Sequence, residues 1–282
     1  MAASVHPSPE QIKKWVERTA PRRRSEVPPH IISALRDGWI ESKNLVEWLV
    51  VDRIHLLQSL VSELQRCDKV SWELDSRDRK WLASIKQLSA LKQSQEIGRW
   101  LTDRIAVGDV AYQRMVCHSS DVVREWSAFL VGSASGLTFP RRLAWIKTHA
   151  DDPNAGTREI AWLALRPYVI EDPVECVRRL VPWTGSRNER LRRYASEITR
   201  PRGVWCSHIA ILKEDPAIGL PILTPLLSDN SRYVGNSVAN WLNDASKSQP
   251  AWVRKVTREW MEQSQTPETD RIVRRALRTI GR

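Results

Sequence analysis

The sequence predicts an all-α fold in which paired helices stack as a helical-repeat solenoid with a concave basic groove. Three observations lead to this prediction. Apolar residues recur at helical spacing along most of the 282 residues. Glycine is sparse, at 11 residues, and the 16 prolines are spaced as breaks between helices would be. Similar segments also return at a regular interval in the second half of the chain.

The chain divides into an amino-terminal arm, residues 1–26, and a single HEAT-like solenoid domain, residues 27–282. In the arm, the sequence predicts one short helix from Pro9 to Arg18 and then a basic cluster. The three arginines at 22–24 either bind a phosphate backbone or form a solvated basic linker. Further on, residues 41–65 follow helical spacing as one long segment, in which Asp52 alone interrupts the apolar side.

The repeat consists of an aliphatic residue, a basic residue and then small and apolar residues. Arg124, Arg158 and Arg192 mark it at 34-residue intervals, a period typical of stacked HEAT helical hairpins. Aligned on one face, these arginines would form a positive track along the groove. The alternative is that they form ion pairs between repeats. Gly235 stands where the fourth unit would carry an arginine. The five units are DVVREWSAFLVG, GTREIAWLALRPYV, ERLRRYASEITRPR, SRYVGNSVANWLND and DRIVRRALRTIG.

Composition narrows the classes of function. The net charge of +11 favours a polyanionic partner such as nucleic acid. Fourteen tryptophans are expected to be mostly helix-packing anchors, with a minority as stacking surfaces for bases. The four cysteines form no CxxC pair and indicate no metal site. Neither a signal peptide nor a run long enough to span a membrane is present, so we expect a cytoplasmic protein without membrane contact.

Residues 190–247 contain two helical segments with unusually mixed polar faces. In the first, Arg193, Glu197 and Arg200 lie opposite an apolar stripe. In the second, an apolar stripe that includes Trp241 lies beside a polar side. That polar side consists of Asn236, Asn240, Asp244 and Lys247. Each helix therefore offers acidic and basic groups on one exposed side.

The segments RLRRYASEITRPRGVW, SRYVGNSVANWLNDASK and RIVRRALRTIG resemble the AlkC/AlkD superfamily of bacterial DNA glycosylases, and the AlkC branch more than the AlkD branch. The SVANxLNDxSK block is the specific part of this resemblance, which extends over residues 27–282. Weaker support comes from LRDGWIESKNLVEWLVVD and VREWSAFLVG. Some relatives append an immunoglobulin-like domain, which we do not expect here because no strand-rich tail is visible.

The resemblance implies a monomeric solenoid that holds alkylated double-stranded DNA in its groove. Such proteins hydrolyse the N-glycosidic bond of cationic methylated bases of the 3-methyladenine type. The AlkC branch is also associated with 3-methylcytosine and 1-methyladenine. The resemblance implies no metal and no organic cofactor. It places the protein in the bacterial cytoplasm, associated with the nucleoid when bound to DNA.

The resemblance also assigns residues. Asp244 of the LND segment and Glu197 of the SExxRP segment match active-site acids, and Trp205 matches the tryptophan that follows. Trp162 departs from the family, which has glutamate five positions before the proline of the preceding Arg-Pro pair. Trp162 either stacks on DNA or packs against a neighbouring repeat. The further residues expected to contact DNA are Arg158, Arg166, Arg193, Arg200, Arg202, Asn240 and Lys247.

Each acid also has a structural interpretation. Asp244 is either the carboxylate that stabilises a cationic sugar or a helix-end acid paired with Lys247. Glu197 either acts directly or pairs with Arg193 or Arg200. At the level of the whole chain, the alternatives to a glycosylase are a HEAT solenoid that binds DNA without excising bases and a protein-interaction scaffold.

Overall fold

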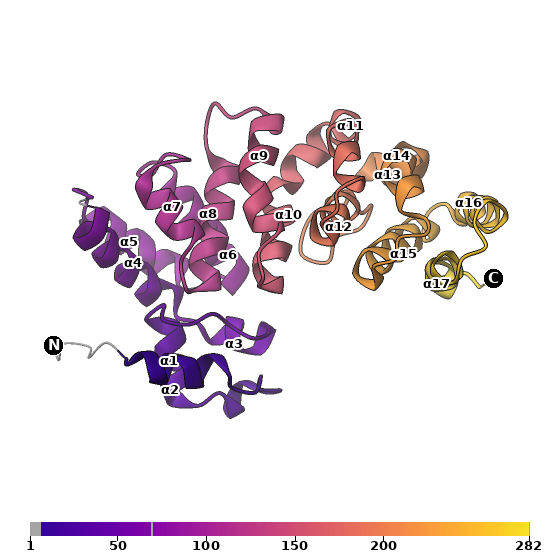
Figure 1. Ribbon diagram of the computed structural model, residues 1–282. Coiled ribbons are helices and arrows are strands. Elements are labelled where there is room, and N and C mark those ends of the chain that lie inside the picture. Colours follow the sequence, from indigo (N-terminus) through magenta and orange to yellow (C-terminus); the bar gives the residue numbers. More distant parts are fainter. Residues whose placement is uncertain (1–6, 69, 282) are drawn as a thin grey trace. The chain divides into compact units, whose positions relative to one another are not determined.

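The structure is a computed structural model that describes residues 7–68 and 70–281. In these residues the backbone forms seventeen α-helices and short 3₁₀ turns, without any strand (Figure 1). This confirms the all-α helical-repeat fold predicted from the sequence. No helix in the described ranges has the length and apolar character needed to cross a membrane. Residues 1–6 of the predicted arm, and Lys69 and Arg282 of the predicted solenoid, lie outside the described residues.

The helices group into two compact units, which we describe separately. The first unit comprises residues 1–136 and 152–160, and the second comprises residues 137–151 and 161–282. The first unit contains α1 (Pro9–Val16), α2 (Pro29–Arg36), α3 (Leu45–Val50), α4 (Arg53–Asp68), α5 (Ser76–Ile85), α6 (Ala90–Leu101), α7 (Val110–Val116), α8 (Asp121–Ser133) and the start of α10 (Ala155–Glu171). The second contains α9 (Phe139–Ala150), the rest of α10, α11 (Pro173–Thr184), α12 (Glu189–Ile198), α13 (Ala210–Glu214), α14 (Leu220–Leu223), α15 (Arg232–Ser246), α16 (Pro250–Gln263) and α17 (Pro267–Ala276).

The predicted long helix over residues 41–65 is wrong in one respect, because the structure breaks it into α3 and α4. Asp52 explains the break. Its carboxylate accepts the backbone N–H groups of Ile54, at 3.1 Å, and His55, at 3.0 Å. An aspartate in this position satisfies donors at the first turn of a helix, so it favours a new start over continuation.

The predicted amino-terminal helix is confirmed as α1, and it packs against the first unit. Trp15 stacks on Trp39, with ring centroids 6.1 Å apart. Just after α1, the Nε of Arg18 donates to Oε1 of the buried Glu47 at 2.8 Å. These contacts attach the predicted arm to the helices that follow it. Residues 22–24, the basic cluster, remain exposed.

The centre of the first unit is the contact between α6 and α8. Every residue of α8 from Asp121 to Val131 is buried, including Trp126. Gly98 of α6 allows the close approach, because a Cβ added there would lie 2.3 Å from the Cβ of Phe129. Close helix contacts of this kind require the smallest side chain at the crossing.

In the second unit, α15 packs against α12, α16 and α17. The indole of Trp241 is fully buried and donates its Nε1 hydrogen to the carbonyl of Thr199 at 2.9 Å, just beyond the end of α12. Gly235, where the repeat predicts arginine, faces α17. A Cβ on Gly235 would lie 3.2 Å from Cγ1 of Ile272. The close approach of α17 therefore explains why this unit departs from the repeat.

The repeated arginines Arg124, Arg158 and Arg192 form hydrogen bonds within the repeats. The Nη1 of each donates to the carbonyls six and five residues earlier, which belong to the turn before its helix. For Arg124 these are His118 (2.7 Å) and Ser119 (3.2 Å), for Arg158 Asp152 (2.6 Å) and Pro153 (2.9 Å), and for Arg192 Ser186 (2.9 Å) and Arg187 (3.2 Å).

Two of these arginines also reach across to the next repeat. The Nε of Arg124 lies 2.8 Å from Asp152, and the Nε of Arg192 lies 2.6 Å from Asp229. For Arg124 and Arg192 the expected positive track is therefore wrong, and the alternative of ion pairs between repeats is confirmed. The physical reason is that a guanidinium with five donors satisfies turn carbonyls and a neighbouring carboxylate at once.

We expect the Gly98→Ala substitution to destabilise the protein by about 1–3 kcal/mol, the usual cost of overpacking a core. In a roomy helix the same change would stabilise by about 1 kcal/mol through helix propensity. Urea denaturation followed by circular dichroism measures the difference. Gly185→Ala is the matched control, because the nearest heavy atom to its Cβ would be 3.9 Å away. A Gly98→Ala protein at least as stable as the wild type would contradict the close α6–α8 contact.

Candidate functional site

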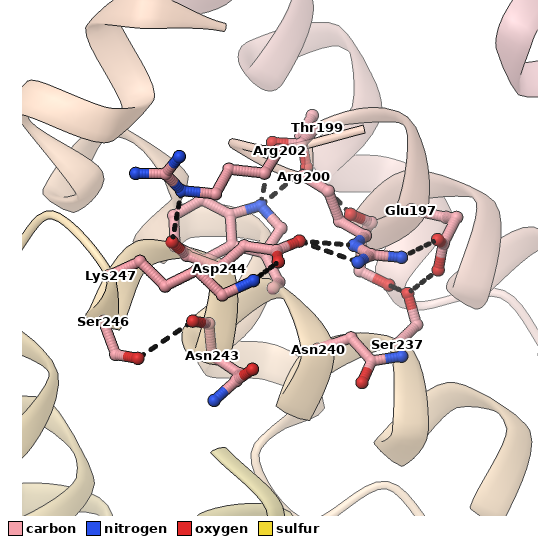
Figure 2. Close-up of polar contacts among 12 residues, drawn as sticks. Glu197, Thr199, Arg200, Arg202, Ser237, Asn240, Asn243, Asp244, Ser246 and Lys247 are labelled. Atoms are coloured by element: carbon pink, nitrogen blue, oxygen red, sulfur yellow. Dashed lines mark hydrogen bonds and ion pairs between the residues drawn. The ribbon is translucent and has the colours of Figure 1, made fainter. Parts of the chain in front are cut away.

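The candidate site lies where the end of α12, the following loop and the second half of α15 meet (Figure 2). Asn188 caps the start of α12 and Ser231 caps the start of α15. Because α12 and α15 pack side by side, Glu197 near the end of one helix approaches the side of the other that carries Asp244. We call these two acids the carboxylate pair, and residues 199–208 the site loop.

The guanidinium of Arg200, from the site loop, joins the carboxylate pair. Its Nη1 donates to Oε1 of Glu197 at 2.6 Å. Its Nε and Nη2 lie 2.9 and 2.7 Å from Oδ2 of Asp244 (Figure 2). One cation therefore holds two carboxylates whose positions in the sequence differ by 47. Such charge-assisted contacts fix orientation as well as charge.

Glu197 is only 3% exposed and is supplied with donors on both oxygens. Besides Arg200, Oε2 accepts the hydroxyl of Ser237 at 2.7 Å and lies 3.5 Å from Nη2 of Arg193. Burial by itself raises the pKa of Glu197, but the charges of Arg193 and Arg200 and the Ser237 hydrogen bond together lower the pKa below its ordinary value. Glu197 is thus held as an anion. The interpretation that it pairs with Arg193 and Arg200 is confirmed.

Asp244 is 4% exposed and is contacted by cations from two sides. Oδ2 faces Arg200, and Oδ1 lies 3.3 Å from Nζ of Lys247, one turn further along the chain. Arg202 contacts the main chain of the same residue. Its Nε donates to the main-chain carbonyl of Asp244 at 3.2 Å, while its Nη2 donates to Ser248 at 2.6 Å. The predicted ion pair of Asp244 with Lys247 is present.

Arg166 does not present its charge to a ligand, contrary to the expectation that it contacts DNA. It is 1% exposed. Its guanidinium donates to the carbonyls of Ile198 (2.5 Å), Arg200 (2.6 Å) and Ser207 (3.3 Å). Arg166 therefore caps the end of α12 and fastens both ends of the site loop. A buried arginine is retained there because carbonyls left without donors at a helix end are costly.

Two tryptophans expected to meet DNA differ in exposure. Trp162 is 5% exposed, which agrees with packing inside the second unit and not with stacking on a ligand. Trp205 in the site loop is 63% exposed, beside Val204 at 78%. An indole with that much free surface is unusual for a monomeric soluble domain, since tryptophan is highly buried on average. Of the two, only Trp205 has an indole that is open to solvent.

The remaining predicted residues lie around the carboxylate pair or at the repeat turns. Arg193 is part of the pair's environment and also stacks on Tyr233, with its Cζ 4.3 Å from the ring centroid. Asn240 lies on α15 one turn before Asp244, and its Oδ1 accepts from Nη2 of Arg278 at 3.1 Å. Arg158 is half-buried at its turn, as described above. In the described ranges, no group of three His, Cys, Asp or Glu residues is arranged to hold a metal ion.

No family model matches the sequence. A stretch of 117 residues, 42% of the chain, is 44% identical to the uncharacterized protein YhaZ of Bacillus subtilis (strain 168) and covers 32% of that protein. Among solved structures, the chain is similar to the alkylpurine DNA glycosylase AlkC of Pseudomonas fluorescens, bound to DNA containing an abasic site analog. The TM-score is 0.67 and the identity 27%. The structure is thus similar to that of a DNA glycosylase of the AlkC/AlkD superfamily, which the sequence resembles.

Two Streptococcus mutans structures share the fold of this chain. For smu.31 of strain UA159 the TM-score is 0.54, covering 71% of this chain and 98% of that one. For AlkD2 it is 0.50, covering 79% and 99%, and both are 23% identical. The similarity to AlkC covers 81% of this chain and 63% of AlkC. The chain therefore spans less than two thirds of AlkC and about a third of YhaZ.

Three residues of the site, Ser237, Ser196 and Arg278, were missed by sequence reasoning. Ser237 lies within the SVANxLND block and was treated as part of a motif, although its hydroxyl contacts Glu197 directly. Ser196 extends this contact by donating to Ser237 at 2.8 Å. Arg278 lies in the last repeat, far from the block, and helical spacing carries no signal that it reaches Asn240. The spacing of residues within one helix carries no information about contacts between repeats.

We expect Glu197→Gln to lower the free energy of unfolding by about 1–3 kcal/mol at pH 7, because hydrogen bonds to a charged group are lost in a buried setting. The pKa of Glu197 is lowered on folding, so its contribution is complete above the ordinary value of 4.5 and is lost as the pH falls through the lowered folded pKa. The stability difference between wild type and variant should therefore shrink below about pH 4.5.

Urea titrations of both proteins between pH 3 and pH 7 measure this difference. The matched control is Glu259→Gln, since Glu259 is exposed and lies 3.9 Å from Lys255. Exposed pairs of this kind contribute little. A wild-type-to-variant difference that stays constant across this range would contradict an ion-paired Glu197.

Proposed function

We propose that this protein acts in DNA alkylation repair, as a glycosylase that hydrolyses the N-glycosidic bond of cationic methylated bases in duplex DNA. The observation that carries the proposal is the carboxylate pair held by Arg200, a residue of the loop that also carries an exposed indole, in a chain whose structure is similar to that of a DNA-bound alkylpurine DNA glycosylase. The proposed substrate is of the 3-methyladenine type, bound by the protein as a monomer.

The chemistry requires little of the protein. The bond between C1′ and the base nitrogen breaks, and its electron pair neutralises the cationic base, which leaves. Positive charge develops on the sugar, and a water molecule adds to C1′ and loses a proton. A carboxylate near the sugar stabilises the developing charge and accepts the proton. We assign this role to Asp244, with Glu197 holding Arg200 in place beside it.

Trp205 is assigned to the base. Its indole is exposed on the site loop, and an aromatic face attracts a cationic ring more strongly than a neutral one. Arg193, Arg200, Arg202 and Lys247 lie around the carboxylate pair and supply positive charge for the DNA backbone. The net charge of +11 acts in the same direction.

We expect Asp244→Asn to reduce release of methylated base by about 100-fold or more, the usual effect of removing a group that stabilises charge in the transition state. DNA binding should change little. Methylated duplex DNA and purified protein, with released base quantified by chromatography, provide the measurement. Asp270→Asn, on the exposed side of α17, is the control of equal charge. Full activity in Asp244→Asn would show that another group performs the reaction.

A second candidate function is favoured by Trp162, a buried indole at the position where the family has glutamate. In this alternative the protein binds DNA without excising bases. Tight DNA binding by the wild type without release of methylated base would support this alternative. Release of methylated base by the Trp162→Glu variant, but not by the wild type, would support it further. Trp162→Phe controls for lost packing. Binding should weaken steeply between about 50 and 200 mM salt if phosphates are contacted; weak, salt-independent binding would favour a protein-interaction scaffold instead.

A further inference from the structure

Both oxygens of Asp244 are already occupied by cations, although the proposed reaction requires this carboxylate to face a third positive charge. Oδ2 is held by Arg200 and Oδ1 by Lys247 (Figure 2). A carboxylate neutralised from both sides offers little attraction to a cationic sugar. One of the two cations must therefore move before Asp244 can act.

The two cations are not equally held. Arg200 is 18% exposed and makes two contacts with Asp244, at 2.7 and 2.9 Å, and a further one with Glu197 at 2.6 Å. Lys247 is 44% exposed and makes one contact, at 3.3 Å. Removing Arg200 would leave two buried carboxylates without their shared partner, which is costly. Removing Lys247 leaves Asp244 still paired.

The position of Lys247 also favours movement. It is the C-cap residue directly after α15, so its side chain leaves the chain at the end of the helix. An ammonium group on a flexible four-carbon stem can exchange one anion for another with small cost. Arg202, another nearby cation, lacks this freedom with respect to Asp244. It contacts the main-chain carbonyl of Asp244 and the hydroxyl of Ser248 rather than the carboxylate.

We propose that Lys247 is an exchangeable counter-ion that masks Oδ1 of Asp244 in the free protein. A cationic sugar displaces its ammonium group, which then binds a backbone phosphate of the same DNA. Lys247 is thus a positioning residue, because it controls the exposure of Asp244 and does not touch the reacting atoms. The inference deepens the proposed function and rests on it, in that Asp244 must face the sugar of bound DNA.

Masking has a consequence for specificity. A neutral ligand in the sugar position does not attract Oδ1, so Lys247 stays paired with Asp244. A cationic ligand displaces the ammonium group of Lys247. The free energy of that displacement offsets part of the ligand's attraction to Asp244. Lys247 therefore reduces the advantage of a cation over a neutral ligand. Its removal should increase that advantage, whereas a lysine that only bound phosphate would leave it unchanged.

The test compares two duplexes that differ in one nucleotide. The first carries a pyrrolidine abasic nucleotide, which is cationic, and the second carries its neutral tetrahydrofuran counterpart. Fluorescence anisotropy gives the Kd for each, and the ratio of the neutral to the cationic Kd measures the preference for a cation. Lys247→Gln is compared with wild type, Asp244→Asn and Lys255→Gln. Lys255, which pairs only loosely with Glu259 on α16, is the control for an equal loss of charge.

We expect Lys247→Gln to raise the ratio about threefold or more, within the range that half-exposed ion pairs produce. Lys255→Gln should leave the ratio at the wild-type value, and Asp244→Asn should bring it close to one. In Lys247→Gln, binding of the cationic duplex should also lose about one phosphate contact in its salt dependence, whereas the salt dependence of the neutral duplex should not change.

The outcomes separate the inference from the proposed function. An unchanged ratio in Lys247→Gln, together with a collapsed ratio in Asp244→Asn, overturns the masking role and leaves the assignment of Asp244 intact. A wild-type preference for the cation that survives in Asp244→Asn means that Asp244 does not face the sugar. That result overturns the proposed role of Asp244 and the masking role with it.

Discussion

The guanidinium of Arg200 lies between the carboxylates of Glu197 and Asp244, and the rest of the candidate site depends on this contact. Two buried acids on either side of one cation would otherwise repel each other. With Arg200 between them, and Arg193 and Ser237 on the outer side of Glu197, both remain in fixed orientation. A site that acts through charge needs such preorganisation, because the protein then does not rearrange its dipoles during the reaction.

The arginine at the centre is itself positioned by another arginine. Arg166 of α10 holds the carbonyls of Ile198, Arg200 and Ser207, so the site loop leaves α12 along one path. Trp241 adds a second attachment through the carbonyl of Thr199. The exposed indole of Trp205 is carried by this same loop. A buried cation therefore sets the geometry of the exposed groups.

The basic residues of the chain divide into two groups with different roles. Arg124, Arg158, Arg166 and Arg192 bind main-chain carbonyls, and Arg124 and Arg192 also pair with carboxylates of the next repeat, so this group stabilises the stacking of helices. Arg193, Arg200, Arg202 and Lys247 surround the carboxylate pair. Part of the positive charge of the sequence is thus used in contacts within the fold. Net charge predicts the sign of the partner, but not which cations meet it.

The sequence by itself determined the helical fold and the repeat, and its resemblance to a known family indicated the two acids of the carboxylate pair. Helical spacing reflects which face is buried, and that information is local. Only the tertiary structure decided that Asp52 starts a helix, that Trp162 is buried and that Arg166 serves the site loop. Whether an arginine faces a carbonyl or solvent depends on residues about 30 to 50 positions away, which the spacing within one helix does not encode. For the same physical reason, helical spacing could not predict the contact of Ser237 with Glu197.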